Sequence, residues 1–263
     1  PDLTGFSDED LAEISSWTPD PKEGKEETDP IPETPENAIS QLGDLWELGD
    51  HRLLCGDSCD AESGERLFDG AVGHMIFTDP PYGVDYDGGA KKRDKLEGDS
   101  IGTDIYEKSL PMLAGCVDKN APLYLWYADG HAAAAAAAAA GYQITAQIIW
   151  AKNHAQFVTS AHYKGKHEPC YYAHKKNSSA RWHGENNEVT LWEYDRASKN
   201  EYHPTQKPVE LAERAIKNST QKGMIILDGF CGSGSTIIAS EKLGRKCYAI
   251  EIEPRYIDVA VKR

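Results

Sequence analysis

The strongest constraint on the fold is a regular alternation of strand-length apolar runs with segments of helical pattern from residue 43 onward. The apolar runs are HMIFTD (74–79), PLYLWY (122–127), QIIWA (147–151), MIILD (224–228) and KCYAIEI (246–252). The helical patterns lie near 103–117, 129–140, 208–219, 235–243 and 254–262. Ahead of them, DLWEL and HRLLC flank Gly49-Asp50 and predict a hairpin. Together these segments predict an α/β domain with a mostly parallel sheet, a fold that binds ligands at the carboxyl ends of its strands.

The first 42 residues differ in composition from this domain. The chain opens on Pro1 rather than Met, and residues 1–17 suggest the end of an upstream segment. Residues 18–42 form an acidic stretch rich in Pro and Glu, and its apolar content is too low to offset the entropy of ordering it. We therefore expect an upstream segment over 1–17, a linker over 18–42 and the main domain over 43–263.

Charge is distributed unevenly along the chain. The formal net charge is −15, but residues 1–37 hold twelve Asp or Glu and two Lys, a net charge of −10. Residues 152–183 contain a single acid, Glu168, and six cations: Lys152, Lys164, Lys166, Lys175, Lys176 and Arg181. Such a local surplus predicts a DNA-facing segment around 152–200 that contacts phosphates through these six side chains. A solvated basic face that binds nothing is the alternative.

Cysteine spacing argues against a structural metal site, and hydropathy argues against a membrane-spanning segment. The six cysteines form no paired CxxC set, so we predict free thiols and no metal site. No apolar run approaches the roughly 18 residues that a membrane span needs. These features predict a cytoplasmic protein without a membrane partner.

The first chemical motif is Asp79-Pro80-Pro81-Tyr82, directly after an apolar strand. Two consecutive prolines fix φ and remove two donors, so the chain must leave the sheet in a rigid extended turn. That turn would present the Asp79 carboxylate and the Pro80 carbonyl as acceptors for the two hydrogens of an exocyclic amine. Tyr82 could stack on a base that has left the duplex. A proline-rich loop with a capping Asp is the structural alternative.

The second motif, LDGFCGSGST (227–236), leaves a strand and opens a helix. Gly232 and Gly234 permit a tight turn and a close approach of the backbone to a ligand. The third glycine of a dinucleotide motif is replaced by Ile237, and no Gly-Lys-Ser/Thr follows for a P-loop. Glu251 ends the next strand, 19 residues after Gly232, where a carboxylate can accept two ribose hydroxyls. A nucleoside ligand without a phosphate chain fits this pattern.

The third motif is HPTQKP (203–208), just before a predicted helix. Pro208 suits a first helical turn. Thr205 and Lys207 would stand at the positive end of that helix, where a carboxylate can bind. Helix capping without a ligand explains the same residues.

These motifs in this order resemble the β-class amino-methyltransferases of DNA, whose catalytic motif precedes the cofactor motif through circular permutation. The resemblance covers residues 43–263 and includes Gly56-Asp57, WAKN (150–153) and HEP (167–169). At the start of the chain, PDLTGFSDEDLAEI resembles the segment that closes a ParB-type partition domain in some phage and prophage methylases.

The resemblance implies a Rossmann-like methyltransferase fold, with helices on both faces of the sheet, and S-adenosylmethionine as cofactor. It assigns catalysis to Asp79, Pro80, Pro81 and Tyr82. It assigns the cofactor site to Asp57, Asp228, Phe230, Gly232, Gly234, Ser235, Glu251, Thr205 and Lys207. The family usually has Pro at the position of Gly229. The glycine in this chain should make the turn looser.

The implied activity is methylation of double-stranded DNA at adenine N6, because the Asp form of the catalytic motif is usual for adenine and a Ser form for cytosine N4. Cytosine N4 methylation stays open, as do an RNA or protein-amide methyltransferase, a non-catalytic DNA-binding protein and a nicotinamide dehydrogenase. The last of these leaves Asp79-Pro80-Pro81-Tyr82 unexplained. A nucleoid-associated enzyme, a homodimer and a cognate restriction enzyme are further expectations.

Overall fold

The computed structural model describes residues 31–81, 104–153, 155, 162–195 and 207–263. The predicted upstream segment (1–17) and most of the predicted linker lie outside the described residues, as do Tyr82 and Thr205. One compact unit runs from Ile31 to Arg263. None of the helices within the described ranges is long and apolar enough to cross a membrane.

A single mixed sheet organises the described residues, with strand order β1-β2-β9-β8-β3-β4-β6-β5-β7. Five neighbouring strands are parallel: β2, β9, β8, β3 and β4. Strand β1 pairs antiparallel with β2, and β6 pairs antiparallel with both β4 and β5. The strands are β1 (Leu45–Leu48), β2 (His51–Cys55), β3 (Met75–Thr78), β4 (Leu123–Trp126), β5 (Tyr142–Ala151), β6 (His167–Lys175), β7 (Leu191–Glu193), β8 (Ile225–Asp228) and β9 (Lys246–Glu251).

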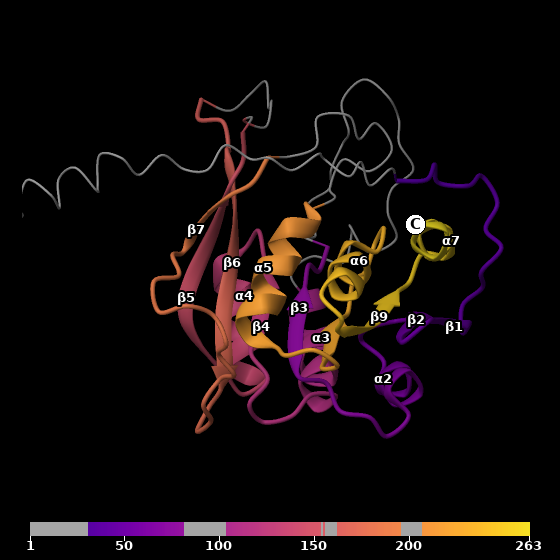
Figure 1. Ribbon diagram of the computed structural model, residues 1–263, viewed down its shortest axis with the longest axis horizontal. Coiled ribbons are helices and arrows are strands. Elements are labelled where there is room, and N and C mark those ends of the chain that lie inside the picture. The colour runs from indigo at the N-terminus through magenta and orange to yellow at the C-terminus, as the bar shows by residue number, and fades with distance from the viewer. Residues whose placement is uncertain (1–30, 82–103, 154, 156–161, 196–206) are drawn as a thin grey trace, which may run out of the picture. The chain divides into compact units, whose positions relative to one another are not determined.

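Helices cover both faces of this sheet (Figure 1). Alternate residues of each strand point to opposite faces, so Ile76 packs with α2 (Ala61–Phe68), α3 (Asp104–Gly115) and α4 (Gly130–Ala139). Its neighbour Met75 joins the opposite layer. That layer is formed by α5 (Val209–Ser219), α6 (Ser235–Lys242) and α7 (Pro254–Lys262). The predicted Rossmann-like fold, a mostly parallel sheet with helices on both faces, is confirmed.

Two elements were not predicted in this form. The run 147–151 is the end of a ten-residue strand, β5, whose partner β6 follows it as an antiparallel neighbour. Helix α2 is short, with eight residues, and is capped by Asp60, whose carboxylate accepts a hydrogen bond from the Glu62 amide. A helix of two turns leaves too short a periodic pattern to stand out from the sequence.

The carboxyl ends of β2, β9, β8, β3 and β4 share one edge of the sheet, which we call the carboxyl edge. Because β6 is antiparallel to β4 and β5, β5 ends and β6 begins at this same edge. Asp79, Asp228 and Glu251 therefore reach the carboxyl edge together with the residues around Lys152 and Glu168.

Candidate active site

The Asp79 turn leaves the carboxyl edge beside the glycine-rich turn. Strand β3 ends at Thr78, which is fully buried, and Pro80 is buried as well. The register of β3 with β8 pairs Ile76 with Leu227, so the two strands deliver their turns side by side. Asp79 keeps 29% of its side chain exposed, which leaves the carboxylate accessible at this edge.

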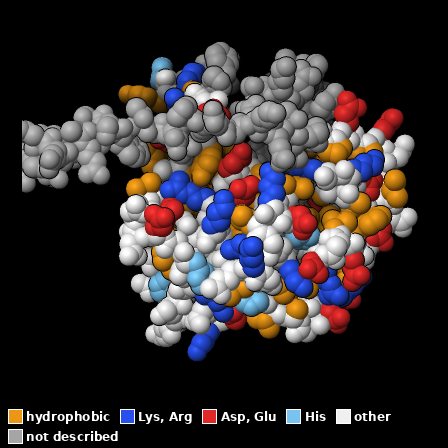
Figure 2. Space-filling view, viewed as in Figure 1, with side chains coloured by type: hydrophobic (Ala, Val, Ile, Leu, Met, Phe, Trp, Pro, Cys, Tyr) orange, Lys and Arg blue, Asp and Glu red, His pale blue; other side chains and the backbone are white. Residues whose placement is uncertain are grey.

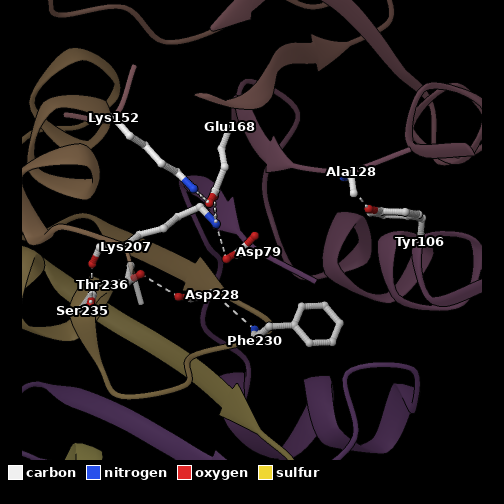
Figure 3. Close-up of polar contacts among 10 residues, drawn as sticks. All are labelled: Asp79, Tyr106, Ala128, Lys152, Glu168, Lys207, Asp228, Phe230, Ser235 and Thr236. Carbon is white, nitrogen blue, oxygen red and sulfur yellow. Dashed lines mark hydrogen bonds and ion pairs between the residues drawn. The ribbon is translucent and has the colours of Figure 1, made fainter. Parts of the chain in front are cut away.

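Hydrogen bonds from its own loop organise the glycine-rich turn. Asp228 accepts from the Phe230 amide at 3.0 Å and from the Thr236 hydroxyl at 2.6 Å (Figure 3). Gly232 and Gly234 adopt φ values of +53° and +86°, which suit glycine far better than other residues. The turn therefore has a fixed shape from which α6 begins.

Gly229, which is predicted to loosen the turn, has a hydrogen-bond partner and a close packing contact. Its carbonyl accepts a hydrogen bond from the Ser58 hydroxyl. A Cβ at position 229 would lie only 2.9 Å from Leu113 Cδ2. The glycine allows α3 to pack closely against the turn.

Asp228 titrates abnormally because it is buried under the turn. Burial raises the pKa of Asp228 to about 7. The hydrogen bonds from Thr236 and Phe230 oppose this rise, and the nearby charges of Asp79 and Glu251 add to it. Near neutral pH this carboxyl group is therefore close to half protonated.

Glu251 connects the ends of β9 and the glycine turn. Its carboxylate accepts from the Gly232 amide at 2.8 Å and from the Glu253 amide at 2.9 Å. Burial raises the pKa of Glu251, and these amide hydrogen bonds counteract the rise. A carboxylate has about four acceptor positions, so two ribose hydroxyls can be added to these contacts.

Asp57 lies next to Glu251 at the end of the neighbouring strand. The Gly56 amide donates to the Glu251 carbonyl at 3.0 Å, and Asp57 is exposed. On the α2 side of Asp57 lies a pocket of about 220 Å³, lined by Leu42, Gly43, Gly56, Asp57 and residues of α2. The glycine turn and the Glu251 carboxylate, which accepts from the Gly232 amide, fit a nucleoside-bearing cofactor.

Four charged side chains form an ion cluster at the carboxyl edge: Lys152, Glu168, Lys207 and Asp79 (Figure 3). Lys207 forms ion pairs with Asp79 and, at 3.2 Å, with Glu168. Lys152 contacts the other oxygen of Glu168. The sequence prediction did not assign Glu168, although it is the only acid in the basic stretch 152–183, and that isolation was the available signal.

Two predicted ligand contacts involve lysines of the ion cluster. Lys207 was expected to hold the carboxylate of the cofactor, but its ammonium is shared by two carboxylates of the protein. Lys152 was expected to face phosphates, but its side chain is only 2% exposed and pairs with Glu168. In the described residues each lysine pairs with a carboxylate of the protein, and its contact with a ligand stays a prediction.

The remaining predicted DNA contacts divide between the two edges of the sheet. Lys164 and Lys166 are exposed and lie between β5 and β6, at the carboxyl edge. Lys175 ends β6 at the opposite edge, where its ammonium donates to the carbonyls of Ala114 and Val117 at 2.8 and 3.0 Å.

The other two cations lie at that opposite edge as well. Arg181 forms a two-bond pair with Asp118, and Lys176 follows directly after β6. Figure 2 shows Lys and Arg side chains interspersed with Asp and Glu on the face drawn, rather than one continuous basic field. Lys175, Lys176 and Arg181 therefore lie at the edge opposite to Asp79, and their contact with DNA stays a prediction.

A metal centre has no support among the described residues, because no three His, Cys, Asp or Glu side chains there come together as a coordination site would require.

Comparisons with known proteins show a family and a fold. The family model described as DNA methylase, of N6/N4 type, matches residues 73–262. The chain is 29% identical over 218 residues to the type II methyltransferase M2.DpnII of Streptococcus pneumoniae, covering 72% of this chain and 81% of that protein.

Solved structures show the same fold. The complex of M1.HpyAVI with S-adenosylmethionine has a TM-score of 0.61 at 26% identity, covering 80% of this chain and 98% of that one. The cytosine-N4-specific PvuII DNA methyltransferase has a TM-score of 0.63 at 15% identity, covering 85% and 89%. This second likeness concerns the fold alone.

Proposed function

Since the chain belongs to the DNA methylase family of N6/N4 type, we propose that it transfers a methyl group from S-adenosylmethionine to N6 of adenine in double-stranded DNA. The observation that carries the proposal is the delivery of Asp79 and the glycine turn to one edge by the adjacent parallel strands β3 and β8. One turn offers acceptors for an amine, and the other offers a cradle for the cofactor.

The cofactor site is formed by the residues around the glycine turn. S-Adenosylmethionine, when bound, supplies a methyl group on a cationic sulfur. Glu251 would accept the ribose hydroxyls, and Asp57 would lie near the adenine ring. The wall of the site would be formed by Phe230, Gly232, Gly234 and Ser235. Thr205, which is not among the described residues, is a further proposed cofactor ligand.

Asp79 and the Pro80 carbonyl act on the amine. By accepting its two hydrogens they favour a pyramidal nitrogen, whose lone pair can form the new N–C bond. The S–C bond breaks as the N–C bond forms, and its electron pair stays on sulfur. The nitrogen gains positive charge during transfer, and its surplus proton then leaves to Asp79 or water. Pro81 keeps the turn rigid, and Tyr82 would stack on the base.

The residue at position 79 favours adenine over cytosine as the methylated base. This chain has Asp79 where Ser is the usual residue for cytosine N4 methylation. Cytosine N4 is the second candidate, because the amine chemistry is the same and the shared fold accommodates both bases.

DNA would approach the carboxyl edge, where the exposed side chains of Lys164 and Lys166 lie between β5 and β6. Contacts of lysine with phosphate fix the position of a protein on a duplex without reading its sequence. Residues 1–37 carry −10 of the net charge of −15, so the rest of the chain carries only −5.

The test uses the purified protein with methyl-labelled S-adenosylmethionine and three acceptors: duplex DNA, RNA and protein. We expect label in DNA only, and none with Asp79→Ala. Label in RNA or protein alone would overturn the proposal, and so would an absence of transfer to any acceptor despite bound cofactor.

A further inference from the structure

The ion cluster extends from Asp79 through Lys207 and Glu168 to Lys152. Asp79 follows β3, Lys207 precedes α5, Glu168 lies on β6 and Lys152 follows β5. Glu168 occupies the centre of the line, with one carboxylate oxygen on each lysine. Four segments distant in sequence therefore converge on one chain of alternating charges (Figure 3).

Both lysines are almost removed from water. The side chain of Lys152 is 2% exposed, and that of Lys207 is 8% exposed. Burial alone would lower the pKa of Lys207, but the charges of Asp79 and Glu168 outweigh it and raise the pKa. Burial likewise favours neutral Glu168, yet Lys207 and Lys152 hold its pKa below the usual value. Lys207 and Glu168 are therefore both charged at neutral pH.

Tryptophan rings fix the lysines from the other side. Lys207 Nζ lies 4.9 Å from the centre of the Trp126 ring, and Lys152 Nζ lies 5.0 Å from that of Trp150. The two rings are fully buried and meet edge to face at 6.4 Å. Ammonium groups are attracted to the faces of aromatic rings. The two lysines of the cluster are therefore held against buried tryptophans of β4 and β5.

The charge balance of the cluster depends on Glu168. With it, two cations face two anions and the net charge is zero. Without it, Asp79 would face two buried cations, and the net charge would be +1. Methyl transfer places positive charge on the nitrogen beside Asp79, and a surplus cation in a site of low dielectric would oppose that change.

We propose that Glu168 is a positioning residue, which holds Lys207 against Asp79 and cancels its charge so that the Asp79 carboxylate remains effective toward the amine. This inference rests on the proposed function of Asp79. It assigns Lys152 the role of compensating the charge of Glu168 rather than contacting DNA.

The central variant is Glu168→Gln, which keeps the shape and removes the charge. We expect kcat to fall at least tenfold, while KM for S-adenosylmethionine changes less than twofold. Glu188→Gln is the matched control, because Glu188 pairs with Arg214 at 2.8 Å and that arginine also lies over a tryptophan, Trp192, at 5.0 Å. The control should retain the wild-type kcat.

A double variant separates charge from structure. Lys152→Met with Glu168→Gln restores a net charge of zero around Asp79, so it should recover several-fold of the kcat lost in Glu168→Gln. A residue needed only for packing would give a double variant as slow as the single one or slower. Thermal unfolding and cofactor calorimetry show whether each variant is folded.

The inference is overturned if Glu168→Gln retains kcat, or if the folded double variant is no faster than Glu168→Gln. It is also overturned if the single variant loses cofactor affinity instead of kcat. Failure of the proposed function is a different result, namely a wild-type protein that does not methylate DNA.

Discussion

Lys207 and Asp79 form an ion pair at the carboxyl edge, although 128 positions separate them in the sequence. This pair connects the residue that would accept the amine with the segment that opens α5. In the proposed site Lys207 therefore belongs to the catalytic side, next to Asp79, and the cofactor would bind around Gly232 and Glu251.

Replacing the Asp79 carboxylate should stop catalysis and spare cofactor binding. We expect Asp79→Ala to lower kcat by about 100-fold or more, because a positioned acceptor contributes about that much. Calorimetry should find that the free energy of cofactor binding changes by less than about 1.5 kcal/mol, the range of one hydrogen bond. Asp118→Ala is the control, since Asp118 also pairs with a cation but at the opposite edge. A larger loss of affinity would identify Asp79 chiefly as a cofactor ligand.

Glu251→Ala should have the opposite effect. Loss of a charged acceptor for two hydroxyls should weaken cofactor binding by about 2–3 kcal/mol, seen as a KM raised roughly 30- to 150-fold. Glu241→Ala provides the comparison, because Glu241 is 75% exposed and contacts His51 instead. An unchanged KM in Glu251→Ala would remove this residue from the cofactor site.

The buried Asp228 carboxyl should make stability depend on pH. Its pKa of about 7 lies above the unfolded value of 3.8, so the folded state holds the proton more tightly. Its contribution is fully present below pH 3.8 and is lost as the pH rises through 7, by up to about 1.4 kcal/mol per pH unit.

Asp228→Asn lacks this titration. The free energy of unfolding of the wild type, relative to that of Asp228→Asn, should therefore increase as the pH falls from 8 to 5. Urea unfolding of both proteins at the two pH values measures the difference. A difference that does not change with pH would contradict the raised pKa.

Salt dependence distinguishes the two edges of the sheet as DNA-binding surfaces. Lys164→Ala with Lys166→Ala should weaken binding similarly for all sequences and flatten the log–log salt slope by about one unit per lost phosphate contact. Lys175→Ala with Lys176→Ala should leave the slope unchanged, because these residues lie at the opposite edge. Flattening by the second pair alone would place DNA at that other edge.

The convergence of Asp79, Asp228 and Glu251 could be predicted from the sequence because each ends an apolar strand. In a parallel sheet such ends meet at one edge, so strand assignment alone gives their proximity. The Rossmann-like fold was predictable for the same reason, since alternation of strands and helices leaves few arrangements.

The ion cluster could not be predicted in this way. Lys152 and Glu168 meet only because β5 and β6 are antiparallel, with Trp150 opposite Glu168 in the register. The basic stretch 152–183 was treated as one surface, but β6 alone extends over roughly 27 Å, counting about 3.4 Å per residue. Its ends therefore reach opposite edges of the sheet, and only the strand register shows which lysines accompany Asp79.

The most direct test of the central claim is nucleoside mass spectrometry of duplex DNA after incubation with the protein and S-adenosylmethionine. The account predicts N6-methyladenine, formed by the wild type and absent with Asp79→Ala. N4-methylcytosine as the only product would contradict the adenine assignment, and unmodified DNA would contradict the proposed activity itself.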